Sequence, residues 1–446
     1  MTNLKKTDPQ IYELIKKEEK RQKEGLELIP SENYTSASVM EAMGSTLTNK
    51  YSEGYPKKRY YGGNENIDNI EIIAQERAKK LFGVVSVNVQ PYSGSPANFA
   101  VYMATLKPGD VFMGQLLTAG GHLTHGAAVS ATAIYHKSIQ YGVKRNLPEL
   151  FDYDEIRKLA LEYKPKLIWV GGTAHPLQFH YEKFAKIADE IGAYLAADIA
   201  HVAGLIAGGV HPSPVPYAHI VTTTTHKTLR GPRGGMIMVT EKGIKKDPDL
   251  PAKINKAIFP GLQGGPHDHQ TAAIAVALKE AATSKFKTYA KQIVKNTKTL
   301  AESLKKEGFT IIGNRGENHL ILMDLVNIFG PGGGIFAQSA LDVAHITLNK
   351  NTIPDEPSSP FYPSGVRLGT PAITTRGLKE RHMPRIAKWI KQVIDEVAGY
   401  KLPTNKEERI ILLKKFRENI NKNKSLKKIA EEVKNLSLQF PVPGIK

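Results

Sequence analysis

From about residue 68 onward, helix-like segments alternate with short apolar segments, and this alternation limits the folds that the chain can adopt. Helical periodicity is present in IEIIAQERAKKLFG, FDYDEIRKLALEYKP and YEKFAKIADEIG. The short apolar segments are VSVNVQP, DVFMGQ, LIWVGG, AYLAAD, HIVTTTT and MIMVT, and they have the length and β-branched content of buried strands. This pattern predicts an α/β fold with a mostly parallel sheet covered by helices on both faces.

The same pattern divides the chain into three parts. Residues 1–67 are expected to form an amphipathic leading helix and a loop-rich arm, and residues 68–288 contain the expected sheet. Residues 289–446 are expected to form a smaller C-terminal α/β domain with strands at FTIIG, HLILMDL and HITLN. A long helical stretch that begins near Ala272 would bridge the two domains, and FGPGGGIF at 329–336 is typical of a flexible connection.

Composition excludes several classes of protein. The chain has no cysteine, which excludes disulfides and thiolate metal sites and favours a reducing compartment, so we expect the cytoplasm. Residues 1–25 carry charges of both signs without an apolar core, unlike a secretory signal or a transit peptide. The apolar segment 192–210 has Asp198 and His201 near its middle, which favours a buried strand over a membrane span.

The formal net charge is +18, which favours association with anionic molecules. A nucleic-acid-binding protein is one class that such a charge allows. The basic residues are mostly not interleaved with aromatic residues that could stack on bases, so we do not expect nucleic acid as a partner.

The segment VTTTTHKTLRGPRGG, residues 221–235, places Lys227 where a strand is expected to end. Open α/β sheets bind ligands at that edge. Burial, together with His226, Arg230 and Arg233 nearby, would lower the pKa of the lysine and make its amine a nucleophile for a carbonyl group. The alternative is a lysine that binds a phosphate beside the backbone N–H groups of GPRGG. The spacing alone does not separate these two hypotheses.

Two further segments could hold parts of a cofactor. Asp198 ends the strand AYLAAD, where a carboxylate could keep the ring nitrogen of pyridoxal phosphate protonated, although an isolated Asp is more often a helix N-cap. Ser93, Gly94 and Ser95 stand between a strand and a helix, where hydroxyl and N–H groups can bind a phosphate. A plain serine N-cap before proline explains that segment nearly as well.

A histidine pair and one arginine also belong to candidate sites. His122 and His125 in AGGHLTHG lack the Glu of a metalloprotease motif, so no metal is expected, and His122 could stack on an aromatic cofactor. Arg367 stands in the extended, glycine-flanked segment SGVRLGTPAITTRG, where a guanidinium could bind a carboxylate through two hydrogen bonds.

Taken in order, these motifs resemble the serine hydroxymethyltransferase family. The resemblance extends from ELIPSENYTS to SGVRLGTPAITTRG and includes LTNKYSEGYPKKRYYGG, VQPYSGSPANFAVY, GGHLTHG, ADIAHVAGL, FPGLQGGPH and NKNTIP. It implies fold type I of the pyridoxal-phosphate enzymes, with a seven-stranded, mostly parallel sheet. It also implies transfer of the hydroxymethyl carbon of serine to tetrahydrofolate or a related reduced pterin, which gives glycine.

The resemblance assigns roles residue by residue. Lys227 would form the Schiff base with the cofactor, Asp198 would pair with its ring nitrogen and His122 would stack on its ring. The implied cofactor-binding set is Lys227, Asp198, His201, His122, Ser93, Gly94, Ser95, Thr173, His226, Gly264, Gly265 and Tyr51. The implied catalytic set is Lys227, Glu53, His122, Tyr61 and Thr224.

The resemblance also implies a substrate-binding set and a shared site. Ser31 and Arg367 would receive the amino-acid carboxylate, and Glu53 and Tyr61 would handle protons near the serine hydroxyl. The rest of this set is Arg233, Ser359 and, at the pterin, Tyr60, Leu117, Gly121, Leu123, Asn351 and Phe361. Tyr51, Glu53 and the Gly264 loop would serve the neighbouring subunit, so the resemblance implies a homodimer, with a tetramer left open.

The chain departs from the usual family pattern at a few positions. Thr173 and His175 replace the Ser and Tyr of a Ser-Ala-Tyr segment, QLLTA precedes GGHLTHG, and Lys57 stands where glycine is common. Thr173 retains a hydroxyl, so we expect cofactor binding to be preserved. An enzymatic alternative is an aldolase that cleaves threonine or another 3-hydroxy amino acid with the same lysine and without folate.

Overall fold

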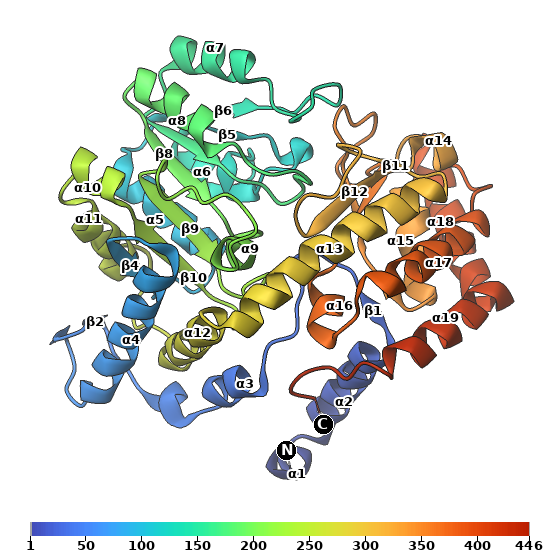
Figure 1. Cartoon of the computed structure of the whole chain (residues 1–446), viewed down its shortest axis with the longest axis horizontal. Coiled ribbons are helices and arrows are strands. Elements are labelled where there is room, and N and C mark those ends of the chain that lie inside the picture. Colours follow the sequence, from blue (N-terminus) through green and yellow to red (C-terminus); the bar gives the residue numbers. More distant parts are fainter. Residues whose placement is uncertain (1, 446) are drawn as a thin grey trace.

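A computed structural model describes residues 2–445 and contains one seven-stranded sheet (Figure 1). The strand order is β4-β10-β9-β8-β7-β5-β6, and all neighbouring strands are parallel except β10, which runs antiparallel to β4 and β9. The predicted mostly parallel sheet is therefore confirmed. The strands are β4 (Ser86–Asn88), β5 (Val111–Gln115), β6 (Lys137–Tyr141), β7 (Leu167–Val170), β8 (Tyr194–Asp198), β9 (Ile220–Thr224) and β10 (Gly235–Val239).

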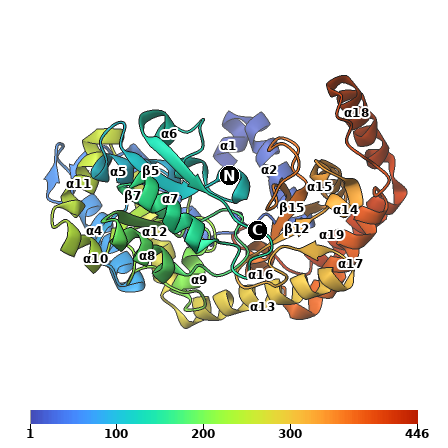
Figure 2. The same cartoon turned by 90° about the horizontal axis from the view of Figure 1, so that it is seen from above.

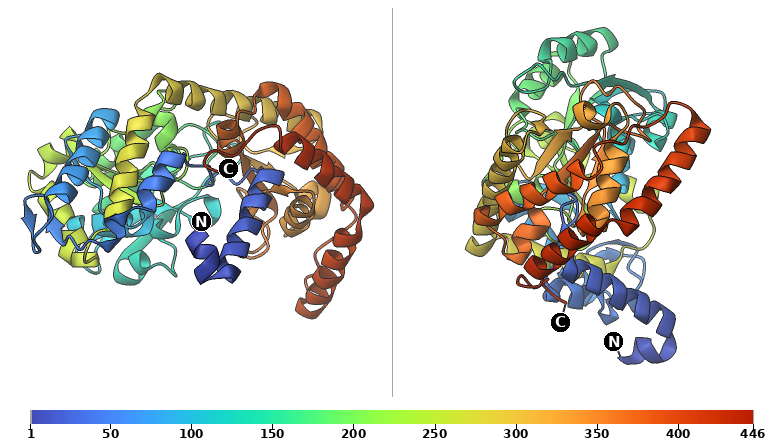
Figure 3. Two further views of the ribbon diagram at one scale, coloured as in Figure 1. Left: turned by 90° about the horizontal axis from the view of Figure 1, so that it is seen from below. Right: turned by 90° about the vertical axis from the view of Figure 1, so that its right-hand side faces the viewer.

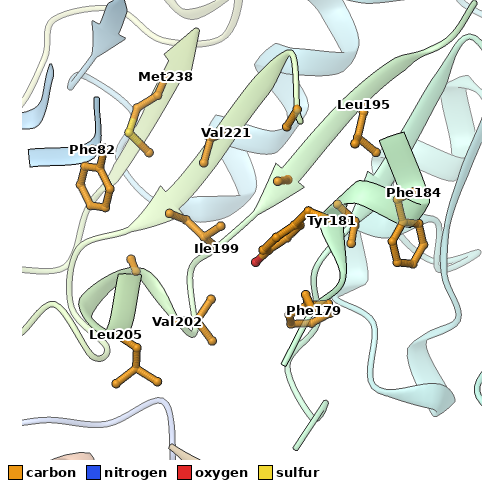
Figure 4. Packing of buried hydrophobic residues seen from close by; sticks show 14 of the residues in the cluster. Phe82, Phe179, Tyr181, Phe184, Leu195, Ile199, Val202, Leu205, Val221 and Met238 are labelled. Carbon is orange, nitrogen blue, oxygen red and sulfur yellow. The ribbon is translucent and has the colours of Figure 1, made fainter. Parts of the chain in front are cut away.

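Side chains of the sheet alternate between two apolar cores because successive residues of a strand point to opposite faces. In β7, Ile168 and Val170 belong to one core and Leu167 and Trp169 to the other. Figure 4 shows part of the first core, to which β8, β9 and β10 contribute Leu195, Val221 and Met238. Its helices are α4 (Glu65–Phe82), α7 (Tyr153–Tyr163), α8 (Tyr181–Glu190), α9 (Ala203–Ala207) and α12 (Asp268–Ala281), whereas α5 (Gly94–Thr105) and α11 (Leu250–Lys256) contribute to the other core.

A second, smaller sheet is antiparallel and lies in the C-terminal part of the chain. Its order is β11-β12-β15-β14, with β11 (Thr310–Ile311), β12 (Leu320–Asp324), β14 (Asn349–Asn351) and β15 (Gly365–Gly369). The helices of this part are α14 (Val326–Phe329), α15 (Gly334–Val343), α16 (Pro371–Arg376), α17 (Met383–Asp395), α18 (Lys406–Lys422) and α19 (Lys424–Ser437). Helix α18 projects away from the rest of the molecule (Figure 2).

Helix α13 (Ser284–Lys306) joins the two parts and runs diagonally between them (Figure 1). Phe286 and Ile293, near its beginning and middle, belong to the first core. Leu300 and Leu304, near its end, belong to the core of the smaller sheet. The domain boundary that the sequence places near residue 288 therefore lies within an uninterrupted helix.

The segment 329–336 is not a flexible connection, so that expectation was wrong. Residues 334–336 begin α15 and are buried. A Cβ atom on Gly333 would lie 2.1 Å from the Cβ of Phe329, and one on Gly334 would lie 2.4 Å from the carbonyl oxygen of Gly365. Glycine is needed at both positions because a side chain would overlap the side chain of Phe329 or the backbone of Gly365.

The N-terminal residues form two helices and an arm that packs against the C-terminal part and against α12. The leading helix is divided into α1 (Thr2–Thr7) and α2 (Pro9–Glu24), because the side chain of Asp8 caps α2 by accepting from the N–H of Ile11 at 3.0 Å. Strand β1 (Leu26–Glu27) pairs with β13 (Ile346–Thr347), and Leu26 belongs to the core of the smaller sheet. Helix α2 packs against α19, which brings the two ends of the chain together (Figure 3).

The arm continues as α3 (Ala37–Met43) and a hairpin of β2 (Gly54–Tyr55) and β3 (Lys58–Arg59). Lys57 has a φ of 63° in the turn of this hairpin, which explains why glycine suits that position. Within residues 2–445, none of the helices combines the length and the apolar character needed to cross a bilayer. The remaining short helical segments are α6 (Ala131–Tyr135), α10 (Glu241–Lys246), η1 (Thr46–Asn49), η2 (Leu117–Ala119), η3 (Leu123–His125), η4 (Ala257–Leu262) and η5 (Glu380–His382).

Candidate active site

A cavity of about 510 Å³ opens at the carboxyl ends of the parallel strands. Loops that follow β4, β5, β7, β8 and β9 form one side of it, as expected where an open α/β sheet binds ligands. Strands β14 and β15 of the smaller sheet contribute to the other side. The lining residues are Ser31, Glu32, Ser93, Gly94, Ser95, Leu117, Gly121, His122, Leu123, Thr173, His201, Thr224, His226, Lys227, Arg233, Asn351 and Arg367.

Lys227 stands three residues after the end of β9, and its side chain lines the cavity. Its Nζ donates to the hydroxyl of Thr224 at 3.1 Å. Burial lowers the pKa of Lys227 to about 8. Asp198 opposes this shift, whereas the positive charges of Arg367 and Arg233 reinforce it. At pH 7 about a tenth of the amine is therefore uncharged, far more than for an ordinary lysine, and this fraction can act as a nucleophile.

Asp198 is the last residue of β8 and is held by three donors. One carboxylate oxygen accepts from Asn98 Nδ2 at 2.8 Å and from His125 Nε2 at 3.1 Å, and the other accepts from the backbone N–H of Ala200 at 3.0 Å. Burial alone would raise the pKa of Asp198, but the hydrogen bond from His125 and the charge of Lys227 hold it below its ordinary value. Asp198 is therefore an ionised carboxylate beside the cavity.

Asn98 and His125 hold the carboxylate of Asp198, and sequence reasoning gave neither of them a role. His125 stacks on Trp169 at a centroid distance of 5.3 Å, and its Nδ1 accepts from the backbone N–H of His122 at 3.3 Å. Because Nδ1 accepts, Nε2 is the ring nitrogen that donates to Asp198. A metal ion could in principle be held by His122, His125 and Asp198, whose potential ligand atoms lie within 4.8 Å of one another. The hydrogen bonds among these residues already account for the arrangement.

His122 caps the short helix η3, and its ring lies at the cavity wall. Its Nδ1 lies 2.7 Å from the hydroxyl of Thr124, which also belongs to η3. Burial lowers the pKa of His122 to about 4, so the ring is neutral at physiological pH. A neutral, fixed imidazole at this place can stack on an aromatic ligand.

Small and polar groups gather where α5 begins. Ser93, Gly94 and Ser95 all line the cavity, and a Cβ atom on Gly94 would lie 2.8 Å from the methyl group of Thr224. The Nδ1 atom of His226, also in the cavity wall, is buried without a hydrogen-bond partner. A helix start with two hydroxyls and a free ring nitrogen is suited to an anionic group such as a phosphate.

Arg367 on β15 reaches across to the large-domain side of the cavity. Its Nε donates to Asn349 Oδ1 at 3.0 Å, and Nη1 donates to the backbone carbonyl of Thr173. Burial lowers the pKa of Arg367 to about 10, which still leaves it charged at neutral pH. Thr173 in turn donates its hydroxyl to the carbonyls of Gly120 and Gly121, each at 3.3 Å. The remaining guanidinium N–H groups are available for a carboxylate.

His201, in the loop after β8, is also in the cavity wall and is paired with a second histidine. Its Nδ1 lies 3.0 Å from Nε2 of His319, a residue just before β12 to which sequence reasoning gave no role. His175, in contrast, does not face this cavity. Its ring stacks on Phe151 at 4.7 Å and lines a smaller cavity nearby.

A second group of predicted site residues lies outside the cavity. The hydroxyl of Tyr51 donates to Glu53 at 3.3 Å, and the ring of Tyr51 packs edge-on against that of Tyr61 at 5.2 Å. Cβ atoms on Gly264 and Gly265 would lie 3.2 Å from Glu53 and 3.6 Å from Tyr51. Tyr60 and Phe361 are 74% and 81% exposed, and Ser359 lies in the same exposed loop as Phe361. None of these residues lines the cavity of its own chain.

Comparison with known proteins gives a consistent result. The serine hydroxymethyltransferase family profile matches residues 4–390. A serine hydroxymethyltransferase of Acidothermus cellulolyticus is 53% identical over 439 residues, which cover 98% of this chain and 96% of the relative. A serine hydroxymethyltransferase of Sorangium cellulosum is 51% identical over 443 residues, with 99% and 97% covered.

The low pKa of Lys227 predicts a cost in stability. Below a pH of about 8, the folded chain must bury a charged amine, whereas the unfolded lysine titrates near 10.5. We expect Lys227→Met to raise the free energy of unfolding of ligand-free protein at pH 7 by about 3 kcal/mol. Because the unfolded chain binds more protons between these two pKa values, wild-type stability should rise with pH there and the advantage of the variant should shrink.

Urea unfolding from pH 6 to about pH 10.5 measures this difference. Lys298→Met, at an exposed lysine of α13, is the matched control and should show little effect. A stabilisation by Lys227→Met that stays constant with pH would contradict the assignment.

Proposed function

The chain belongs to the serine hydroxymethyltransferase family, and from that premise we propose that the cavity around Lys227 is where serine and a reduced folate react. One observation carries this proposal. Lys227 and Arg367 come from segments far apart in sequence and line the same cavity, and Asp198 lines a small adjoining pocket that Lys227 also lines, as binding of an aldehyde cofactor together with an amino acid requires.

The residues of the cavity fit pyridoxal phosphate. Lys227 provides a partly uncharged amine for covalent attachment, and Asp198 provides an ionised carboxylate for the ring nitrogen. The unpartnered Nδ1 of His226, with Ser93 and Ser95 at the start of α5, suits the phosphate. A cavity of about 510 Å³ is large enough for the cofactor together with an amino acid.

When bound, pyridoxal phosphate supplies an electron sink for the charge that develops on the amino acid. Asp198 would keep the ring nitrogen protonated, and the neutral ring of His122 would stack on the cofactor. Arg367, with Ser31, would bind the carboxylate of serine and so fix which bond to Cα stands perpendicular to the ring plane. Such orientation contributes to catalysis because the translational and rotational entropy of the reacting groups is lost on binding and no longer adds to the activation barrier.

The second substrate is proposed to be tetrahydrofolate or a related reduced pterin. Leu117, Gly121, Leu123 and Asn351 line the same cavity and would border the pterin. The lack of cysteine supports a reducing compartment such as the cytoplasm for this reaction.

We further propose that two copies of the chain share each active site. Tyr51, Glu53 and Tyr61 lie outside the cavity of their own chain, and Tyr51 and Tyr61 are 57% and 50% exposed. An apolar cavity of about 450 Å³ adjoins the main cavity, since Ser95 and Leu123 line both. A two-fold dimer would place the exposed tyrosines and Glu53 of one copy at this position in the other. Glu53 and Tyr61 would then hold and move a proton at the serine hydroxyl oxygen.

The first expected outcome concerns the carrier. Glycine formation from serine should require tetrahydrofolate, because the one-carbon unit of serine must be transferred to a nucleophilic nitrogen of the carrier. The measurement is glycine produced from serine with and without tetrahydrofolate in protein loaded with pyridoxal phosphate. Equal rates without the carrier would refute the transferase assignment and support a folate-independent aldolase.

The second expected outcome concerns Arg367. Arg367→Lys keeps the charge but loses the planar pair of donors, so we expect the KM for serine to rise by about 10- to 100-fold. The affinity for pyridoxal phosphate, measured by its visible absorbance, should change much less. Arg315→Lys, at an exposed arginine, is the control. If serine and the cofactor are weakened equally, Arg367 does not bind the carboxylate.

The third expected outcome concerns the shared site. Lys227→Ala and Glu53→Gln should each be inactive alone, but unfolding and refolding them together should restore about a quarter of wild-type activity. Half of the dimers are then mixed, and each mixed dimer has one site with native Lys227 and native Glu53. Lys227→Ala mixed with Arg367→Ala should restore none, since both residues line one chain's cavity. Absence of restoration in the first mixture would contradict sharing.

A further inference from the structure

His201 and His319 form a buried pair whose protons determine what the cavity wall offers to a ligand. His201 Nδ1 lies 3.0 Å from His319 Nε2, and the two side chains belong to residues 5% and 0% exposed. Burial lowers the pKa of both rings. The nearby charge of Lys227 lowers that of His201 further, and the charge of Arg367 lowers that of His319 further, so both rings are neutral. One ring must therefore donate and the other accept in this hydrogen bond.

Two arrangements of the protons are compatible with the distance. If His201 donates from Nδ1, its Nε2 presents a lone pair, and His319 must carry its proton on Nδ1. If His319 donates from Nε2, His201 carries its own proton on Nε2. The two arrangements give the cavity opposite hydrogen-bonding groups.

The surroundings of His319 distinguish these arrangements. Its Nδ1 is buried without a hydrogen-bond partner. A proton there would be an unpaired buried donor, and such donors are rarer in folded proteins than unpaired acceptors. We propose that His319 is a positioning residue that donates from Nε2 to His201 Nδ1 and so holds His201 in the tautomer with an N–H directed to the cavity side.

The charges of the cavity agree with this assignment. Lys227, Arg233 and Arg367 line the cavity with His201, so the groups that bind there are anionic oxygens. An Nε2–H on His201 can donate to such an oxygen, whereas a lone pair would repel it. His319 thus adds a donor to the site without touching the ligand.

The backbone around His319 holds its ring in place. Asn318 donates from Nδ2 to the carbonyls of His175 and Leu177, each at 2.9 Å, and its Oδ1 accepts from the N–H of Leu320 at 2.9 Å. The carbonyl of His319 accepts from Thr370 N–H at 3.1 Å. The ring therefore extends from a segment anchored to both parts of the molecule, which suits a residue that orients another.

The first experiment reads the tautomer directly. Heteronuclear NMR of the full-length protein with isotope-labelled histidine distinguishes protonated from unprotonated ring nitrogens, and His201→Gln identifies the signals of His201. We expect a protonated Nε2 and an unprotonated Nδ1 for His201, with and without pyridoxal phosphate. His125 is an internal reference, because its Nδ1 accepts from a backbone N–H. A protonated Nδ1 on His201 would overturn the proposal.

The second experiment tests the consequence. His319→Gln places an amide donor near the position of Nε2, whereas His319→Leu removes the donor at similar volume. We expect His319→Leu to mix the two tautomers of His201 and to lower kcat/KM for serine by about 10- to 100-fold, as when a partner that orients another histidine is removed. His319→Gln should restore the tautomer and most of the activity. His211→Leu, at a buried histidine outside the cavity, should leave the tautomer unchanged.

Equal losses in the Leu and Gln variants, or a fixed Nε2–H tautomer in His319→Leu, would show that His319 does not set His201. The tautomer is independent of the proposed function, and only the effect on serine cleavage depends on it. An Nε2–H tautomer in a protein that does not cleave serine would therefore refute the function and leave the assignment standing.

Discussion

The partial desolvation of the Lys227 amine is the constraint on which the rest of the site depends. Burial disfavours the ammonium form, and Asp198 is the acidic neighbour that opposes this effect. Asp198 is itself almost buried, and the hydrogen bond from His125 together with the charge of Lys227 holds its pKa low. Asn98 and a backbone N–H also donate to it. Each charged group in the cavity thus requires a further polar group behind it.

The second structural requirement is that the two parts of the molecule meet at the cavity. Arg367 belongs to the smaller sheet but donates to the carbonyl of Thr173 after β7. Asn318 crosses the same boundary to the carbonyls of His175 and Leu177. The groups proposed to bind the carboxylate and the cofactor therefore keep their spacing through hydrogen bonds between main chain and side chain, and not through apolar packing alone.

Much of this arrangement could be predicted from the sequence, for physical reasons. Buried parallel strands are continuous apolar runs, so six strands of the large sheet are visible in the pattern. Strand β6 was missed because KSIQY, at the sheet edge, is mostly half-exposed and mixes polar with apolar residues. The glycines at 332–334 were misread as flexible because composition does not show that they allow close packing.

Some site residues could likewise be identified from the sequence, whereas others could not. Lys227, Asp198 and Arg367 stand in motifs whose local pattern marks a strand end or a glycine-flanked strand. Asn98, His319 and Asn349 have no such local signal, since each acquires its role from a contact made only in the folded chain. His125 was noted as one of two histidines, but its bond to a residue 73 positions away could not be read from spacing.

The continuity of α13 has a consequence for how the molecule unfolds. Phe286 and Ile293 anchor the helix in one core and Leu300 and Leu304 in the other, without a break between them. Because most of the stability of a helix in a protein comes from tertiary packing, melting of one core removes packing that also holds α13 in place for the other core. The two halves are therefore thermodynamically linked, and denaturation of one cannot proceed without weakening its neighbour.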